Sequence, residues 1–152
     1  MNSTPLRVLI TAGPTHERID AVRYLANRSS GRMGEALADA ACEAGAEVTL
    51  LLGPTGRDPG ARWRNAIRFE SSEDLFRMLA DAMPGHDCLI MAAAVADFRP
   101  ATDHLGKIRR GDSRLTLELL PTEDLLASAA ARRRPDQFIV GFALEDPQEL
   151  EH

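Results

Sequence analysis

The residues from Leu6 to Gly34, LRVLITAGPTHERIDAVRYLANRSSGRMG, decide how this chain folds. They open with a near-continuous apolar run, Leu6–Thr11, which is typical of a strand that is covered on both faces. They close where apolar residues begin to recur at helical spacing. The connection between the two is longer than about 12–15 residues, and such long connections in a compact domain are usually functional or disordered. This one is rich in specific polar side chains, which favours a functional loop.

Further apolar strands and amphipathic helices alternate along the rest of the chain. Beyond the first strand, the pattern predicts buried strands at Ala46–Leu52, Ala66–Glu70, Asp87–Ala94 and Gln137–Leu144, and a more exposed one at Arg114–Leu119. Helices are expected from about Met33 to Gly45, after a capping Ser72, and from a capping Thr122 to about Ala131. This alternation predicts an α/β fold: a three-layer, Rossmann-like domain with a mainly parallel sheet and a central first strand. Ligands bind such sheets at the carboxyl ends of the strands.

Composition limits the classes of protein that fit. The 152 residues make one domain, 1–152, and 18 basic against 23 acidic residues argue against general nucleic-acid binding. No apolar run reaches the ~18 residues of a membrane helix, and no signal peptide is evident, so a cytoplasmic protein is expected. Cys42 and Cys88 are expected to be small buried residues without a disulfide. His16, His86 and His104 lack metal-ligand spacing, so we expect surface histidines and no metal site.

The first candidate site lies in the long connection. Gly13 follows the first strand directly, where a missing side chain lets a ligand approach the backbone, and Thr15 offers a hydroxyl. An ordinary strand-ending turn explains both residues equally well. Further along, Ser29 or Ser30 can cap the helix, and Gly31 leaves its N-terminus bare, which favours anion binding. Capping without any ligand is the alternative.

Two later segments contain further candidate binding residues. Small residues that include Ala93 and Ala94 end a buried strand, and Asp97 follows them, placed to accept hydrogen bonds from an amino group or a ribose. Tight packing and a turn-forming aspartate explain this segment as well. The run Gly106–Arg110 places Lys107 among further cations between glycines, which suits a mobile flap over phosphates, although a solvated charge cluster is the common explanation. The cations repel one another, so this flap is expected to be poorly ordered without a ligand.

A dehydrogenase fits less well. The chain lacks the three-glycine dinucleotide fingerprint, and Gly53-Pro54 stands where an acidic ribose ligand would follow the second strand. An NAD(P)-dependent oxidoreductase is therefore the weakest of the readings that the residues allow.

Several of these motifs together resemble the phosphopantothenoylcysteine synthetase family, the second domain of the flavoprotein-related coenzyme A biosynthesis proteins. The matching stretches ITAGPT, VRYLANRSSGRMG, AAAVADFRP, GKI and VGFALE occur in family order between about Leu6 and Glu145. The resemblance implies ligation of 4′-phosphopantothenate to cysteine, with CTP and its Mg²⁺ as co-substrate and an acyl-cytidylate as intermediate. It also implies a homodimer with the active site close to the interface. No FMN is expected, because the flavin belongs to a separate upstream domain.

The same resemblance assigns roles to particular residues. Asn27 would hold the acyl-cytidylate, and Arg23 and Lys107 would contact the substrate, the intermediate or the nucleotide. Ala93 to Asp97, with Ala94 between them, would receive the nucleotide, with Asp97 a ligand of CTP, and Phe142 would lie against the base. The expected nucleotide-binding residues also include Asp124 and the candidates named above, Gly13, Thr15, Ser29, Ser30 and Gly31.

The chain also departs from the family. Glu123 replaces the proline that usually precedes the residue matching Asp124, and a carboxylate pointing inward would repel phosphates. The family continues past Phe142 with a basic helix whose lysines bind the triphosphate, so we expect a C-terminally incomplete domain. The alternative to an active ligase is a catalytically inactive, dimeric nucleotide-binding module of the same family.

Overall fold

The computed structural model describes residues 4–111 and 114–143. Five parallel strands form the central sheet, in the order β5-β4-β1-β6-β9. Two small antiparallel pairs, β2 with β3 and β7 with β8, lie apart from it. The strands are β1 (Arg7–Pro14), β2 (Glu17–Arg18), β3 (Tyr24–Leu25), β4 (Glu47–Leu52), β5 (Ile67–Arg68), β6 (Cys88–Ala94), β7 (Phe98–Pro100), β8 (Leu119–Pro121) and β9 (Phe138–Gly141). The helices are α1 (Arg32–Glu43), α2 (Ser72–Ala82), the 3-10 turn η1 (Met83–Gly85) and α3 (Leu125–Arg132).

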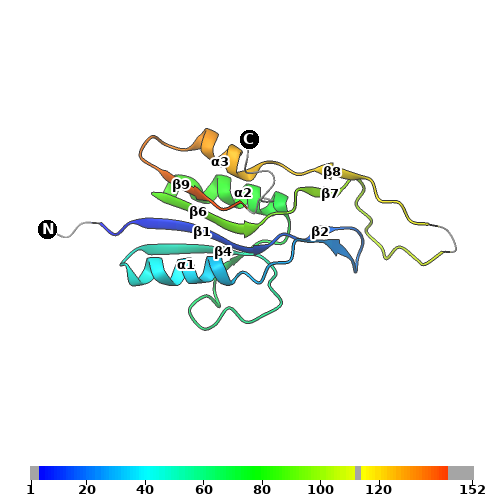
Figure 1. Cartoon of the computed structure of the whole chain (residues 1–152), viewed down its shortest axis with the longest axis horizontal. Helices are drawn as coiled ribbons and strands as arrows, with labels where there is room; N and C mark the ends of the chain where they lie inside the picture. The colour runs from blue at the N-terminus through cyan, green and yellow to red at the C-terminus, as the bar shows by residue number, and fades with distance from the viewer. Residues whose placement is uncertain (1–3, 112–113, 144–152) are drawn as a thin grey trace, which may run out of the picture.

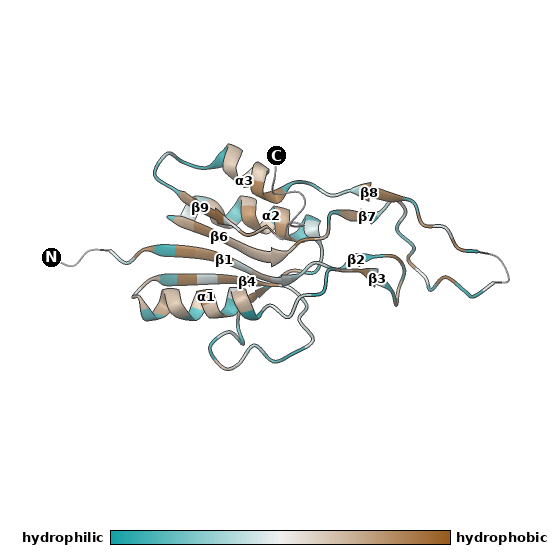
Figure 2. Ribbon diagram, viewed as in Figure 1, coloured by the Kyte–Doolittle hydropathy of each residue, from teal (hydrophilic) through white to brown (hydrophobic). Residues whose placement is uncertain are grey.

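The sheet separates two helical layers, as the sequence predicts. Helix α1 covers one face, and α2 and α3 cover the other (Figure 1). Strand β1 lies in the middle of the sheet, and its side chains point alternately toward the two helical layers, because successive residues of a strand point to opposite faces. Leu9 packs toward α2 and α3, whereas Val8 and Ile10 pack toward α1. Figure 2 shows brown, hydrophobic residues along the central strands, and teal, hydrophilic residues in bands on the helices, in the loops and at the starts of strands such as β1 and β4. The predicted three-layer fold is thus confirmed.

Helix α1 packs very closely on β1 because Gly34 has no side chain. A Cβ atom at this position would lie 2.4 Å from Cβ of Ala12 and 2.9 Å from the Thr11 carbonyl oxygen. The close contact fixes the N-terminal turn of α1 against the carboxyl-terminal half of β1. It therefore sets the position of the helix end that the sequence analysis identifies as an anion site.

Several local predictions need correction. Ser71, not Ser72, caps α2: its hydroxyl accepts the Asp74 N–H, and the Asp74 carboxylate accepts the Ser71 N–H. Asp124, not Thr122, caps α3. Among the described residues of 114–119, only Leu119 belongs to a strand, because that strand is set by its pairing with β7. The last predicted strand covers only Phe138–Gly141 and is mostly exposed, not buried; Leu144 lies outside the described residues. The strand predicted to be buried at Ala66–Glu70 covers only Ile67–Arg68, and both residues are exposed, because β5 is an edge strand of the sheet.

The burial of the cysteines and histidines agrees only in part with the prediction from the sequence. Cys42 and Cys88 are free and half-buried. His104 is exposed as expected, but His16 and His86 are half-buried. The ring nitrogens of His86 lie 2.7 Å from the Ala82 carbonyl oxygen and 2.8 Å from the Thr49 hydroxyl, so both nitrogens are engaged in hydrogen bonds within the fold.

No helix in the described part of the chain combines the length and the apolar character that crossing a membrane would require.

Candidate functional site

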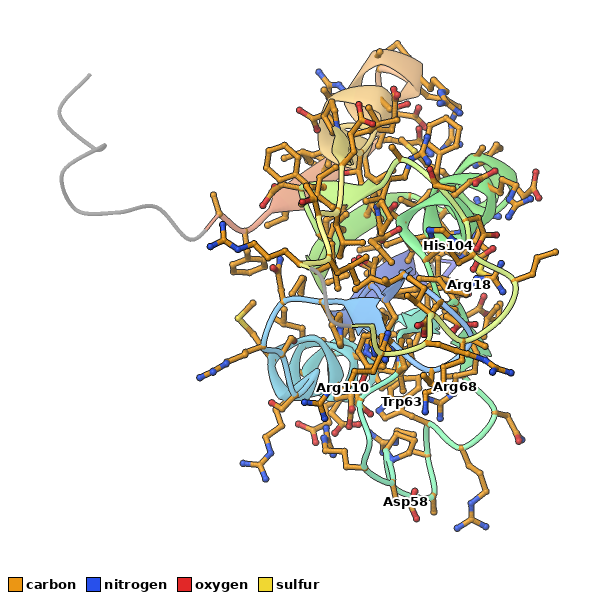
Figure 3. All side chains as sticks on the ribbon, turned by 90° about the vertical axis from the view of Figure 1, so that its right-hand side faces the viewer. Arg18, Asp58, Trp63, Arg68, His104 and Arg110 are labelled. Atoms are coloured by element: carbon orange, nitrogen blue, oxygen red, sulfur yellow. The ribbon has the colours of Figure 1, made fainter. Side chains whose placement is uncertain are left out.

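The carboxyl ends of β1, β4 and β6 converge beside the N-terminus of α1. Gly13 and Gly31 both have positive φ angles, 81° and 73°, which glycine adopts without strain. A Cβ atom on either would lie within 3 Å of the Thr55 methyl group, at 2.9 Å for Gly13 and 2.8 Å for Gly31. The two glycines therefore allow the end of β1, the start of α1 and the loop after β4 to meet. Figure 3 views this end of the molecule.

The N-terminus of α1 is open, as an anion site requires. Gly31 is the N-cap, and no side chain in the described part of the chain caps the helix. The Ser29 hydroxyl accepts the Gly31 N–H at 3.3 Å, so it closes the preceding turn instead. Within the described residues, the N–H groups of Arg32, Met33 and Gly34 have no acceptor. Three free amides and the positive end of the helix dipole favour an anion.

A cation that the sequence analysis missed stands beside this helix end. Arg57, in the loop after β4, donates from Nε to the Ser30 carbonyl oxygen at 2.9 Å. Its guanidinium also forms an ion pair with Glu35, a buried carboxylate in the first turn of α1. The ion pair ties the loop to the helix and offsets the negative charge that Glu35 would otherwise place beside an incoming anion.

Hydrogen bonds link the long connection to the end of β6. Asn27 donates from Nδ2 to the Val95 carbonyl oxygen at 2.9 Å. The Thr15 hydroxyl accepts the Ala96 N–H at 2.9 Å, and the Thr122 hydroxyl donates to the Ala96 carbonyl oxygen at 2.6 Å. Thr15 is fully buried, so its hydroxyl positions the 94–96 backbone and is not presented to a ligand.

Arg23 belongs to a second cluster, built around a buried aspartate. The Asp20 side chain is completely buried and lies 2.8 Å from Nη1 of Arg23. The same guanidinium lies 3.4 and 3.3 Å from the carbonyl oxygen of Ile108, the residue after Lys107. Burial raises the pKa of the Asp20 carboxyl, but N–H donors from Val22, Ile108 and Arg23 and the charge of Arg23 outweigh burial and hold that pKa below its ordinary value near 3.8.

The remaining predicted site residues differ in how exposed they are to solvent. Lys107, Asp97 and Glu123 are exposed, and Ala93 and Ala94 are half-buried. Asp124 accepts the Ala127 N–H at 2.8 Å, so one of its oxygens is engaged in capping α3. Phe142 is 52% exposed beyond the end of β9. Within the described residues, no hydrogen bond connects the Lys107 side chain to Asn27 or to the 94–96 backbone that Asn27 and Thr15 hold.

Comparisons with known proteins place this arrangement in a family. The family model of the DNA/pantothenate metabolism flavoprotein C-terminal domain matches residues 4–152. The chain belongs to this family. Among curated relatives, it is 43% identical over 140 residues to the coenzyme A biosynthesis bifunctional protein CoaBC of Vibrio vulnificus, covering 91% of the chain and 35% of that protein. CoaBC of Bacillus subtilis is 41% identical over 153 residues, with 99% and 37% covered.

Solved structures agree with the family assignment. The chain matches the crystal structure of the C-terminal domain of CoaBC with a TM-score of 0.79 and 37% identity, covering 96% of the chain and 68% of that structure. A Cab2 mutant in complex with phosphopantothenate-cysteine has a TM-score of 0.78 at 18% identity, with 95% and 66% covered, which shows the shared fold.

A relative with another name matches the same residues. A cysteine/cysteine sulfinic acid decarboxylase of an unknown prokaryotic organism is 47% identical over 144 residues, covering 95% of the chain and 40% of that protein. The chain thus spans 35% to 40% of the length of these curated relatives. Neither name therefore passes to this chain as a whole.

Proposed function

We propose that this family member is a phosphopantothenate–cysteine ligase that activates its acid substrate with CTP. The observation that carries the proposal is the open N-terminus of α1, where three amides have no acceptor among residues 4–111 and 114–143, beside the glycine turns at Gly13 and Gly31. This is a site for a phosphate group, and Asn27 stands in the connection that leads into it.

The proposed reaction has two steps. The carboxylate of 4′-phosphopantothenate attacks the α-phosphate of CTP, and pyrophosphate leaves. The amine of cysteine then attacks the acyl carbon of the acyl-cytidylate, and CMP leaves. Charge develops on phosphate oxygens in the first step and on the acyl oxygen in the second, and fixed N–H donors stabilise both.

The chain supplies donors suited to these charges. We assign the α1 amides to a phosphate group and the Asn27 amide to the acyl-cytidylate. Arg23 and the exposed Lys107 contribute positive charge, and Phe142 offers an exposed ring for the base. No group of three acidic, histidine or cysteine side chains that could hold a metal occurs among the described residues. Mg²⁺ would therefore arrive on the CTP phosphates, which need only one or two protein carboxylates.

We also propose that the protein forms a homodimer and that it is located in the cytoplasm. The β7–β8 pair projects from the sheet and exposes apolar side chains, with Phe98 53%, Leu119 41% and Leu120 39% accessible (Figure 1). Exposed apolar surface of this kind favours burial against a partner.

The experiment is a coupled assay. The protein is incubated with CTP, Mg²⁺, 4′-phosphopantothenate and cysteine, while pyrophosphate release and the ligated product are measured. We expect pyrophosphate only when CTP and phosphopantothenate are both present, and product only when cysteine is added. CTP binding without turnover would instead select the inactive nucleotide-binding module, and neither binding nor turnover would refute both readings.

A further inference from the structure

We propose that Asp20 is a positioning residue, which fixes Lys107 for the nucleotide by holding the neighbouring peptide of Ile108. The inference rests on the proposed function, since that function is what gives Lys107 a ligand. Asp20 itself is buried and touches no substrate, so it acts through the segment it holds.

The two carboxylate oxygens of Asp20 bind different partners. Oδ1 accepts the backbone N–H groups of Val22 and Arg23, at 2.8 and 2.9 Å, and so builds the local turn between β2 and β3. Oδ2 accepts Nη1 of Arg23 at 2.8 Å and the Ile108 N–H at 3.0 Å. The turn needs only Oδ1, whereas Oδ2 reaches a residue 88 positions away in the sequence.

Ile108 is held at both of its backbone groups. Its N–H donates to Asp20, and its carbonyl oxygen faces the Arg23 guanidinium that Asp20 orients. A second link lies on the other side of Lys107, where Arg18 donates from Nε to Asp103 at 2.9 Å. Figure 3 shows Arg18 beside His104, where the loop passes the β2–β3 pair. Lys107 therefore sits between two links to the same hairpin.

Charge explains why the holding residue is a carboxylate. Lys107, Arg109 and Arg110 lie on one short segment, and Arg23 brings a fourth cation to it. The negative charge of Asp20 offsets this repulsion while leaving the exposed Lys107 ammonium available for an anion. Asp20 makes no contact that would compete for that ammonium, because its carboxylate is turned inward.

The substitution Asp20→Asn separates the two functions of the side chain. An amide keeps one oxygen for the Val22 and Arg23 N–H groups, but it points an NH₂ group at the Ile108 N–H and at Arg23. The turn is preserved, and the link to Ile108 is lost. Asp136→Asn is the matched control, since it removes an exposed carboxylate that bonds Arg134 elsewhere on the molecule.

The test uses three readouts on the 152-residue chain. Native trypsin cleavage after Lys107, Arg109 and Arg110 is followed by mass spectrometry, together with the thermal midpoint and the CTP affinity. Loss of a charge-assisted hydrogen bond changes a local opening equilibrium about ten- to a hundredfold, so we expect cleavage at these three sites to accelerate by that factor in Asp20→Asn. We expect a lower thermal midpoint, because the ionised Asp20 stabilises the fold, but unchanged cleavage elsewhere, weaker CTP binding, and no change in Asp136→Asn.

Amide hydrogen exchange of the unmodified chain keeps the proposal testable even if Asp20→Asn does not fold. The poorly ordered flap that the sequence predicts and the hydrogen bonds at Ile108 have opposite consequences for the free chain. We expect the Ile108 amide to exchange slowly, and exchange at the rate of an unstructured peptide would overturn the proposal. If Asp20→Asn is cleaved at the parental rate, the proposal is wrong. It is also wrong if cleavage accelerates at every site together with a lower thermal midpoint, because that result is expected of a residue that only stabilises the fold. Equal CTP affinity of parent and variant would refute the positioning of Lys107. A parent that binds no CTP refutes the proposed function, while exchange and proteolysis still decide whether Asp20 holds the segment.

Discussion

At the scale of single residues, Asn27 connects the fold to the proposed chemistry. Its side-chain amide carries two N–H donors, and one hydrogen bond to the Val95 carbonyl oxygen fixes the side chain against the end of β6. The residue is exposed, so it contributes little to the core. A fixed, exposed amide is suited to stabilising charge on an acyl-phosphate without taking part in proton transfer.

We predict that Asn27→Asp keeps the fold and loses most turnover. The carboxylate cannot donate, and it would repel both the Val95 carbonyl oxygen and the acyl-phosphate. Removal of one oxyanion donor commonly lowers kcat about 10²–10³-fold. Pyrophosphate release at saturating CTP measures the loss, and Asn65→Asp, the same change at an exposed residue to which we assign no role in the site, is the control. Equal turnover of Asn27→Asp and parent would contradict the role assigned to Asn27.

At the scale of secondary-structure elements, the packing of α1 on β1 sets the phosphate site. Gly34 lies in the first turn of α1, directly against Ala12 of β1. Any side chain at this position separates helix and strand, and the helix end moves with it. The geometry of the site therefore depends on a contact that involves no ligand-binding group.

We expect Gly34→Ala to destabilise the protein by about 1–3 kcal/mol, the usual cost of overpacking, despite the better helix propensity of alanine. Urea unfolding measures the change. Gly85→Ala is the matched control, because nothing lies within 4 Å of a Cβ at Gly85. If Gly34→Ala unfolds at the same urea concentration as the parent, α1 is not held against β1 as closely as described.

At the scale of the whole molecule, the layers could be predicted from the sequence and the side-chain contacts could not. Buried parallel strands produce apolar runs, so the mainly parallel sheet and the central place of its first strand could be predicted from local pattern, but the order of the other strands could not. Ser71 and Ser72 are chemically equal neighbours, and only the contacts of Asp74 and Glu17 distinguish them. The burial of Thr15 and the link from Asp20 to Ile108 depend on distant segments, which no local spacing reveals.

One measurement tests the central claim, that a nucleotide binds at the carboxyl ends of the central strands beside the open end of α1. CTP with Mg²⁺ is titrated into isotope-labelled protein while backbone amide chemical shifts are recorded. The account predicts the largest changes at the free amides of Arg32, Met33 and Gly34 and along the 93–97 segment. Changes confined to the opposite end of the sheet, near η1 and the cavity between α2 and α3, would contradict it.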